Sequence, residues 1–256
     1  MARIPSLVCC LLLLWSTLCL HALGADPPIK LGIQRDFEDK TANPIFSYSA
    51  WIEFKESARS PDGFPPETMS SEKLVKLTIM AYDEMRKLHS DLLFPPERRP
   101  SAMIGLAMGK HIFFASSMKG DYKSYYAPVR KEGESRLRAE VREALIHCQT
   151  LAASPKHQTN LGCGEPSVYD VAFASEVKVE GYNRIAPCVA FGPGQAPINI
   201  KPCGKKGSGY GCDRIVEQFG SNVVASKQPD AGDGSEWKDQ FVVRTKKRFC
   251  MAESNP

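Results

Sequence analysis

The sequence predicts an α/β fold in which helices flank one mixed β-sheet. Segments 71–89 and 134–151 carry apolar residues at three- and four-residue steps, the period of a helix with one buried face. Between them, residues 101–117 form two apolar runs around a Gly-Lys pair, which indicates a hairpin buried on both faces. Shorter helical and strand-like segments alternate after residue 160. This alternation predicts helices arranged around one mixed sheet.

The first 24 residues predict a secretory signal peptide. Arg3 precedes a mostly apolar run from Leu7 to Leu20, and small residues follow up to Gly24. The run of about 14 residues is short for a membrane anchor, and no second long apolar stretch occurs. We therefore expect a secreted, extracellular protein that has no membrane partner once the signal is removed.

Residues 25–66 predict an irregular extension with one strand, because apolar residues alternate from Phe46 to Phe54. Residues 67–250 predict a single domain. Its first helix is capped by Ser70 or Ser71 and stopped by prolines before residue 100. The later elements are expected in the order helix 134–151, a short helix from Cys163 with Pro166 in its first turn, strands 185–191 and 198–201, helix 212–219 ending at Gly220, strand 222–225 and an edge strand 241–245.

The cysteines are the main clue to function. The chain has 256 residues and nine cysteines, of which three lie in the expected signal peptide. The other six are Cys148, Cys163, Cys188, Cys203, Cys212 and Cys250. An even number in a secreted chain is typical of disulfides. The net charge of +4 falls to +3 with the loss of Arg3 and indicates no strong affinity for nucleic acid by itself.

A different use of cysteine is indicated by three features in order: Cys163-Gly164-Glu165, Pro202-Cys203, and Cys212 at the start of a helix. Three thiolates can hold Zn²⁺ and leave a fourth position for water, whose pKa the metal lowers. A carboxylate that does not bind the metal, such as Glu165, can then transfer the proton of that water.

These residues resemble the motifs of the zinc-dependent nucleoside, nucleotide and nucleic-acid deaminases, which carry His- or Cys-x-Glu on one helix and Pro-Cys-x-x-Cys on the next. Residues 162–166 are most similar to the secreted toxin-type branch. The resemblance implies a three-layer deaminase-like fold over roughly residues 67–226, with one extra helix before the first motif. It also implies a zinc-dependent hydrolase that removes an amino group from a nucleobase in a nucleoside, nucleotide or nucleic acid and that could act as a toxin or effector. Cys163, Cys203 and Cys212 would hold Zn²⁺, and Glu165 would be catalytic.

Two departures leave alternatives open. Eight residues, 204–211, separate Cys203 from Cys212, whereas the family usually has two; the glycine-rich insert could bulge out at a small entropic cost. Pro187-Cys188 competes with Pro202-Cys203, and we prefer the latter because Cys212 and its helix follow it. Zinc binding would leave Cys148, Cys188 and Cys250 as disulfide candidates. The alternative function is a non-catalytic secreted effector or binding protein stapled by disulfides; a nuclease-type toxin lacks a recognisable catalytic set.

The remaining polar residues carry weaker signals. His111 is expected at the surface and His147 in solvent, while His89 and His157 stand in polar sequence without an evident partner. Basic residues near the second motif and the end of the chain could contact a phosphate group: Lys205, Lys206, Arg214 and residues 246–248.

Overall fold

The computed structural model describes residues 29–36, 46–55, 69–120, 137–152, 157, 162–177, 183–190, 195–204, 210–224 and 234–244. The expected signal peptide, Cys250, Lys205, Lys206 and residues 246–248 lie outside these ranges. Within the described ranges, no helix combines the length and the apolar character needed to cross a membrane.

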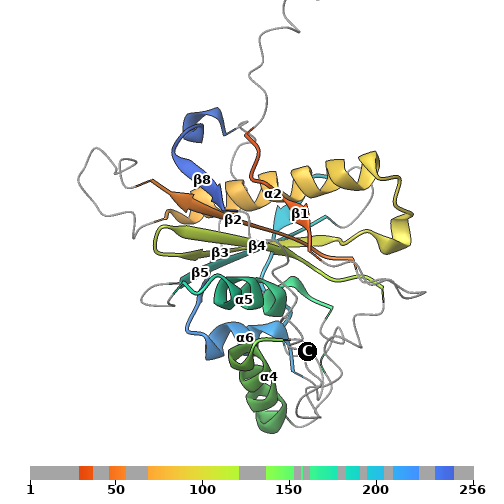
Figure 1. The fold of residues 1–256 in the computed structure, drawn as a ribbon. Coiled ribbons are helices and arrows are strands. Elements are labelled where there is room, and N and C mark those ends of the chain that lie inside the picture. The colour runs from red at the N-terminus through yellow and green to blue at the C-terminus, as the bar shows by residue number, and fades with distance from the viewer. Residues whose placement is uncertain are drawn as a thin grey trace, which may run out of the picture.

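One open sheet of eight strands runs through the fold (Figure 1). Its strand order is β1-β2-β4-β3-β5-β6, with β8 also paired to β2 and β7 also paired to β5. The β5–β7 pair is parallel and the others are antiparallel, so the sheet is mixed as predicted. The strands are β1 (Gln34–Arg35), β2 (Tyr48–Phe54), β3 (Ala102–Met108), β4 (His111–Ser116), β5 (Asn183–Val189), β6 (Ile198–Asn199), β7 (Asn222–Val223) and β8 (Phe241–Arg244).

The predicted hairpin forms the centre of the sheet. Met108 of β3 pairs with His111 of β4, and Gly109 in the turn has a φ of 55°, which favours glycine. Successive side chains point to opposite faces, so Leu106 and Phe113 join one core cluster while Ala107 joins the other. Most side chains of both arms are apolar and buried because both faces of the hairpin are covered.

Helices cover the two faces unequally (Figure 1). Among the α-helices that the structure describes, α2 (Ser71–Asp91) covers one face, and Ser70 caps it by accepting a hydrogen bond from the Lys73 N–H group. On the other face, α5 (Gly164–Ala174) packs against β3 and β4, and it contacts both α6 (Cys212–Gln218) and α4 (Ala139–Leu151). The predicted three-layer α/β arrangement is therefore confirmed. Two short 3-10 helices, Pro96–Arg98 and Ser235–Trp237, complete the described elements.

Two boundaries differ from the sequence-based expectation. Helix α4 begins at Ala139 rather than near residue 134, and the Arg138 N–H group donates instead to Asp170 Oδ1 of α5 at 2.8 Å. Strand β2 lies in the segment expected to be an extension, yet it pairs with β4 and with β8. The sheet of the main fold therefore includes part of that segment.

Candidate metal centre

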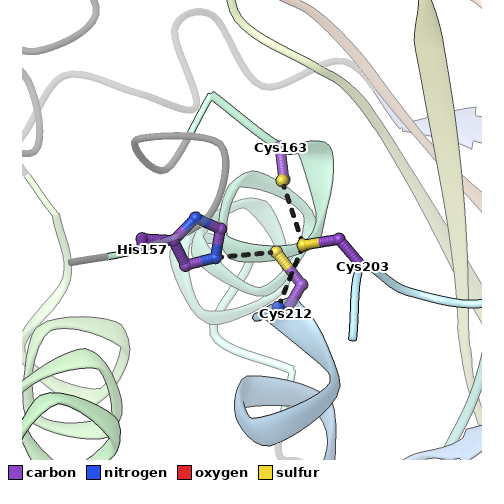
Figure 2. A group of neighbouring side chains, drawn as sticks. All are labelled: His157, Cys163, Cys203 and Cys212. Carbon is purple, nitrogen blue, oxygen red and sulfur yellow. Dashed lines mark hydrogen bonds between the residues drawn. The ribbon is translucent and has the colours of Figure 1, made fainter. Parts of the chain in front are cut away.

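Three cysteines that are far apart in the sequence meet on the side of the sheet that α5 and α6 cover (Figure 2). Cys163 is the N-cap residue of α5, and Cys212 is the first residue of α6. Cys203 follows β6 at the end of the described segment 195–204. These are the three residues that the sequence motifs selected, and the structure brings them together.

Gly164 lets the first motif approach the hairpin. A Cβ atom at this position would collide with Ile104 Cδ1 and would come within 3.0 Å of the Ala115 carbonyl oxygen. Glycine therefore allows α5 to start directly against β3 and β4, which fixes Cys163 and Glu165 beneath the sheet.

The two ends of the long insert between Cys203 and Cys212 lie close together. The Cys212 N–H group donates to Cys203 Sγ at 3.2 Å, and the Asp213 N–H group donates to the Cys203 carbonyl oxygen at 3.1 Å. A Cβ atom at Gly211 would collide with that carbonyl group, so glycine is required where the two ends meet. The insert therefore still delivers the two thiols to one place.

A fourth side chain, His157, joins the three thiols. His157 Nε2 lies 3.4 Å from Cys212 Sγ, and Cys163 Sγ lies 3.6 Å from Cys203 Sγ. All four possible ligand atoms lie within 4.8 Å of one another. In a tetrahedral zinc site, Zn–S and Zn–N bonds of ordinary length separate two sulfurs by about 3.8 Å and a sulfur from a nitrogen by about 3.6 Å. The spacing of these side chains therefore fits a metal ion such as zinc.

The placement of His157 corrects the expectation that it has no partner. His157 is 3% exposed, and its ring contacts the Tyr210 ring edge-on with centroids 4.9 Å apart. The only signal in the sequence was its position six residues before Cys163, in a polar segment without periodicity. His89 is also buried, against Tyr48, because it lies on the sheet-facing side of α2.

Of the other two described histidines, His147 is exposed as expected, whereas His111 is half-buried rather than fully at the surface. His147 is exposed on α4. His111 is half-buried at the start of β4, where its Nδ1 accepts a hydrogen bond from Trp51 Nε1–H at 3.2 Å. Neither belongs to the metal cluster.

Hydrogen bonds within the cluster favour one thiolate. The Cys163 side chain, followed by that of Cys212, donates toward Cys203 and holds the pKa of the Cys203 thiol below its ordinary value. The same interaction raises the pKa of Cys163, and burial raises that of Cys212. Cys203 is therefore the thiol of the cluster that ionises most readily, and a cation would stabilise its thiolate.

Glu165 is buried beside the thiols. Glu165 is 5% exposed. Burial, together with the charge of Cys203, raises the pKa of its carboxyl group to about 7. A hydrogen bond from the Cys212 side chain acts in the opposite direction. A carboxyl group with a pKa near neutrality can both accept and release a proton, which is the property a proton shuttle needs.

The remaining cysteines lie apart from the cluster. Cys148 and Cys188 are free thiols, and they belong to the core clusters on opposite faces of the sheet. Cys188 is therefore on the α2 side and cannot replace Cys203 in the group. Cys250, the third disulfide candidate, lies outside the described residues.

A cavity of about 270 Å³ lies between α4 and α6. Cys148 and Tyr210 line it together with Arg214, which is exposed and pairs with Glu217 at 3.2 Å. Tyr210 is thus common to the cavity wall and to the contact with His157. Arg214 is the one residue of the predicted basic group that the structure describes.

The chain was compared with known proteins at three levels. No protein family, no curated protein and no solved structure matches it.

Proposed function

We propose that this protein is a secreted zinc-dependent deaminase that acts on a nucleobase in a nucleoside, a nucleotide or a nucleic acid. The observation that carries the proposal is the convergence of Cys163, Cys203 and Cys212 with the buried carboxyl group of Glu165. Disulfide formation would explain the cysteines but would give no role to this carboxyl group. Burying it next to thiolate sulfur is unfavourable, so a proton-transfer role accounts for it better.

The order of elements also supports the proposal. The resemblance implies helix, hairpin, helix with the first motif, strand, helix with the second motif, and strand. Helix α2, the β3–β4 hairpin, α5, β5, α6 and β7 follow one another in that order, with α4 added before α5.

The roles of the residues follow from their positions. Cys163, Cys203 and Cys212 would hold the metal at the starts of α5 and α6. When bound, zinc would supply Lewis acidity and make a water molecule nucleophilic near neutral pH. Glu165 would take a proton from that water and pass it to the departing amino group, so that water and the amino-bearing base become the keto base and ammonia.

The test combines metal content with ammonia release. We expect about one zinc per chain and ammonia release from at least one member of a panel of nucleosides, nucleotides and single-stranded DNA and RNA. Glu165→Gln should retain the zinc and lower turnover by about 100-fold or more. Glu143→Gln, on the exposed side of α4, is the matched control and should change neither quantity. Full activity in Glu165→Gln would contradict the proposal.

The position of His157 beside the three thiols favours a second candidate function, in which the zinc site is structural. Four protein ligands are typical of structural zinc sites, whereas catalytic sites keep one position open. On this interpretation the protein is a non-catalytic secreted effector or binding protein, and the metal rather than disulfides holds its helices together. Among the described residues, Cys148, Cys163, Cys188, Cys203 and Cys212 are not joined to one another by disulfides. Zinc without ammonia release from any substrate of the panel would favour this candidate.

A further inference from the structure

A histidine side chain lies beside the three thiols, where a fourth ligand of the candidate metal site would be expected. His157 Nε2 lies 3.4 Å from Cys212 Sγ, and its ligand atom belongs to the group whose members all lie within 4.8 Å of one another. The sequence motifs alone leave this position to water. The geometry instead offers a complete set of three sulfurs and one nitrogen (Figure 2).

The position of His157 is fixed by contacts outside the cluster. Its backbone forms an isolated bridge with Tyr210, and its ring meets the Tyr210 ring edge-on. Tyr210 is 2% exposed and stands two residues before Cys212 in the chain. The same short segment therefore places one thiol and the imidazole that faces it.

A purely structural site would not need Glu165. Glu165 is 5% exposed. Its carboxyl group forms a hydrogen bond with the Cys212 side chain and interacts electrostatically with Cys203. A metal held by four protein ligands has no position for the water that such a carboxylate would serve. The buried Glu165 carboxyl group and the set of four protein ligands are both explained if the site is catalytic and its fourth ligand keeps it closed.

We propose that His157 is the fourth ligand of the metal and that it keeps the centre closed to water, substrate and other external ligands. The inference rests on the proposed function for its catalytic consequence, because deamination would then require the imidazole to leave the metal. The closure itself can be tested without any substrate.

The first measurement is made on the parent protein. X-ray absorption at the zinc edge of the zinc-loaded full chain should show three sulfur ligands and the outer-shell scattering of one imidazole. His157→Gln should keep the three sulfurs and lose the imidazole signal, while His147→Gln, which changes an exposed histidine, should keep it. A parent spectrum without imidazole would overturn the proposal, and this result needs no variant to fold.

The second measurement uses azide as the external ligand and Co²⁺ as the metal. Azide should leave the visible spectrum of the cobalt-loaded parent unchanged but should shift that of His157→Gln. His157→Cys restores a fourth protein ligand and should exclude azide again. Equal azide binding to the parent and to His157→Gln would refute closure, whatever their activity.

Ammonia release separates this inference from the function on which it rests. If the centre is open for less than a tenth of the time, His157→Gln should deaminate about tenfold faster or more than the parent. If azide binds only to His157→Gln but no variant deaminates any substrate, closure stands and the deaminase proposal fails. If both His157→Gln and His157→Ala lose the metal, His157 is needed to retain the metal. That result would overturn the proposal that His157 leaves the metal during catalysis.

Discussion

Among single residues, Asp36 carries a clear pH dependence outside the metal centre. It follows β1, its residue is 5% exposed, and the Ser49 hydroxyl donates a hydrogen bond to its Oδ1 atom. Burial raises the pKa of this carboxyl group from 3.8 to about 7. Between these two values the folded protein keeps a proton that the unfolded chain has lost, so the folded state loses stability as the pH rises through this window.

We predict that Asp36→Asn removes this dependence. At about 1.4 kcal/mol per pH unit, ionisation of Asp36 costs the parent up to about 4 kcal/mol of unfolding free energy at pH 8 relative to pH 4. The amide keeps the size of the side chain and cannot ionise, so the variant should gain stability over the parent as the pH rises. Urea unfolding at pH 4.5 and pH 8 measures the change.

Asp91→Asn, at the exposed end of α2, is the control for that experiment and should follow the parent at both pH values. A difference between Asp36→Asn and the parent that stays constant from pH 4.5 to pH 8 would show that Asp36 does not titrate in this range.

Single residues also show where sequence reasoning about the site succeeds and where it stops. Cys163, Cys203 and Glu165 were predicted because each belongs to a short motif whose spacing carries chemical meaning. His157 was missed because it stands in a polar segment with no motif, and tertiary contacts such as that with Tyr210 place it beside the thiols. Residues that reach a site through tertiary packing leave no local signal.

Among the elements, the first periodic helix and the apolar hairpin were predicted well. Helix α2 begins at Ser71 as expected, and the two arms of the hairpin lie within the predicted range. The start of α4 was placed too early because its first predicted turn has acceptable helix formers, while Asp170 of α5 binds the Arg138 N–H group instead. The very short β1 was not predicted, because two residues cannot display an alternation.

The insert between Cys203 and Cys212 gives a prediction at the level of one loop. Gly204 and Gly211 stand at its two ends, but only Gly211 lies against the Cys203 carbonyl group, where a Cβ atom would collide. At Gly204 a Cβ atom would make an ordinary contact of 3.7 Å with Asp213 Oδ2. Gly211→Ala should therefore separate Cys203 from Cys212 and weaken zinc binding by about tenfold or more.

Gly204→Ala is the matched control, since it makes the same chemical change in the same loop. Its zinc affinity, measured by competition with a chromophoric chelator, should stay within about twofold of the parent. Equal affinities for the two alanine variants would mean that the close approach at Gly211 does not position the cluster.

At the scale of the whole molecule, the sheet divides the protein into two cores with different dependence on the metal. One core lies under α2 and contains none of the four candidate ligands. The other contains α4, α5 and α6, and the cluster joins the starts of α5 and α6. The sequence could predict the layers, but the face on which Cys188 of β5 lies depends on strand register, which no local pattern specifies.

This division predicts that metal removal loosens one side of the molecule first. A metal bound only to the folded state at 100 times its dissociation constant stabilises it by about 2.7 kcal/mol, so a chelator should lower the Tm by roughly 5–10 °C. Amide hydrogen exchange should accelerate in α5 and α6, whose first turns the metal joins, while α2 and the β3–β4 hairpin keep their protection. The double variant Cys163→Ser, Cys203→Ser serves as the control, because the chelator should change neither its Tm nor its exchange. Uniform acceleration over both faces would instead mean that the two cores unfold as one unit, and an unchanged pattern in the parent would mean that the cluster holds no metal.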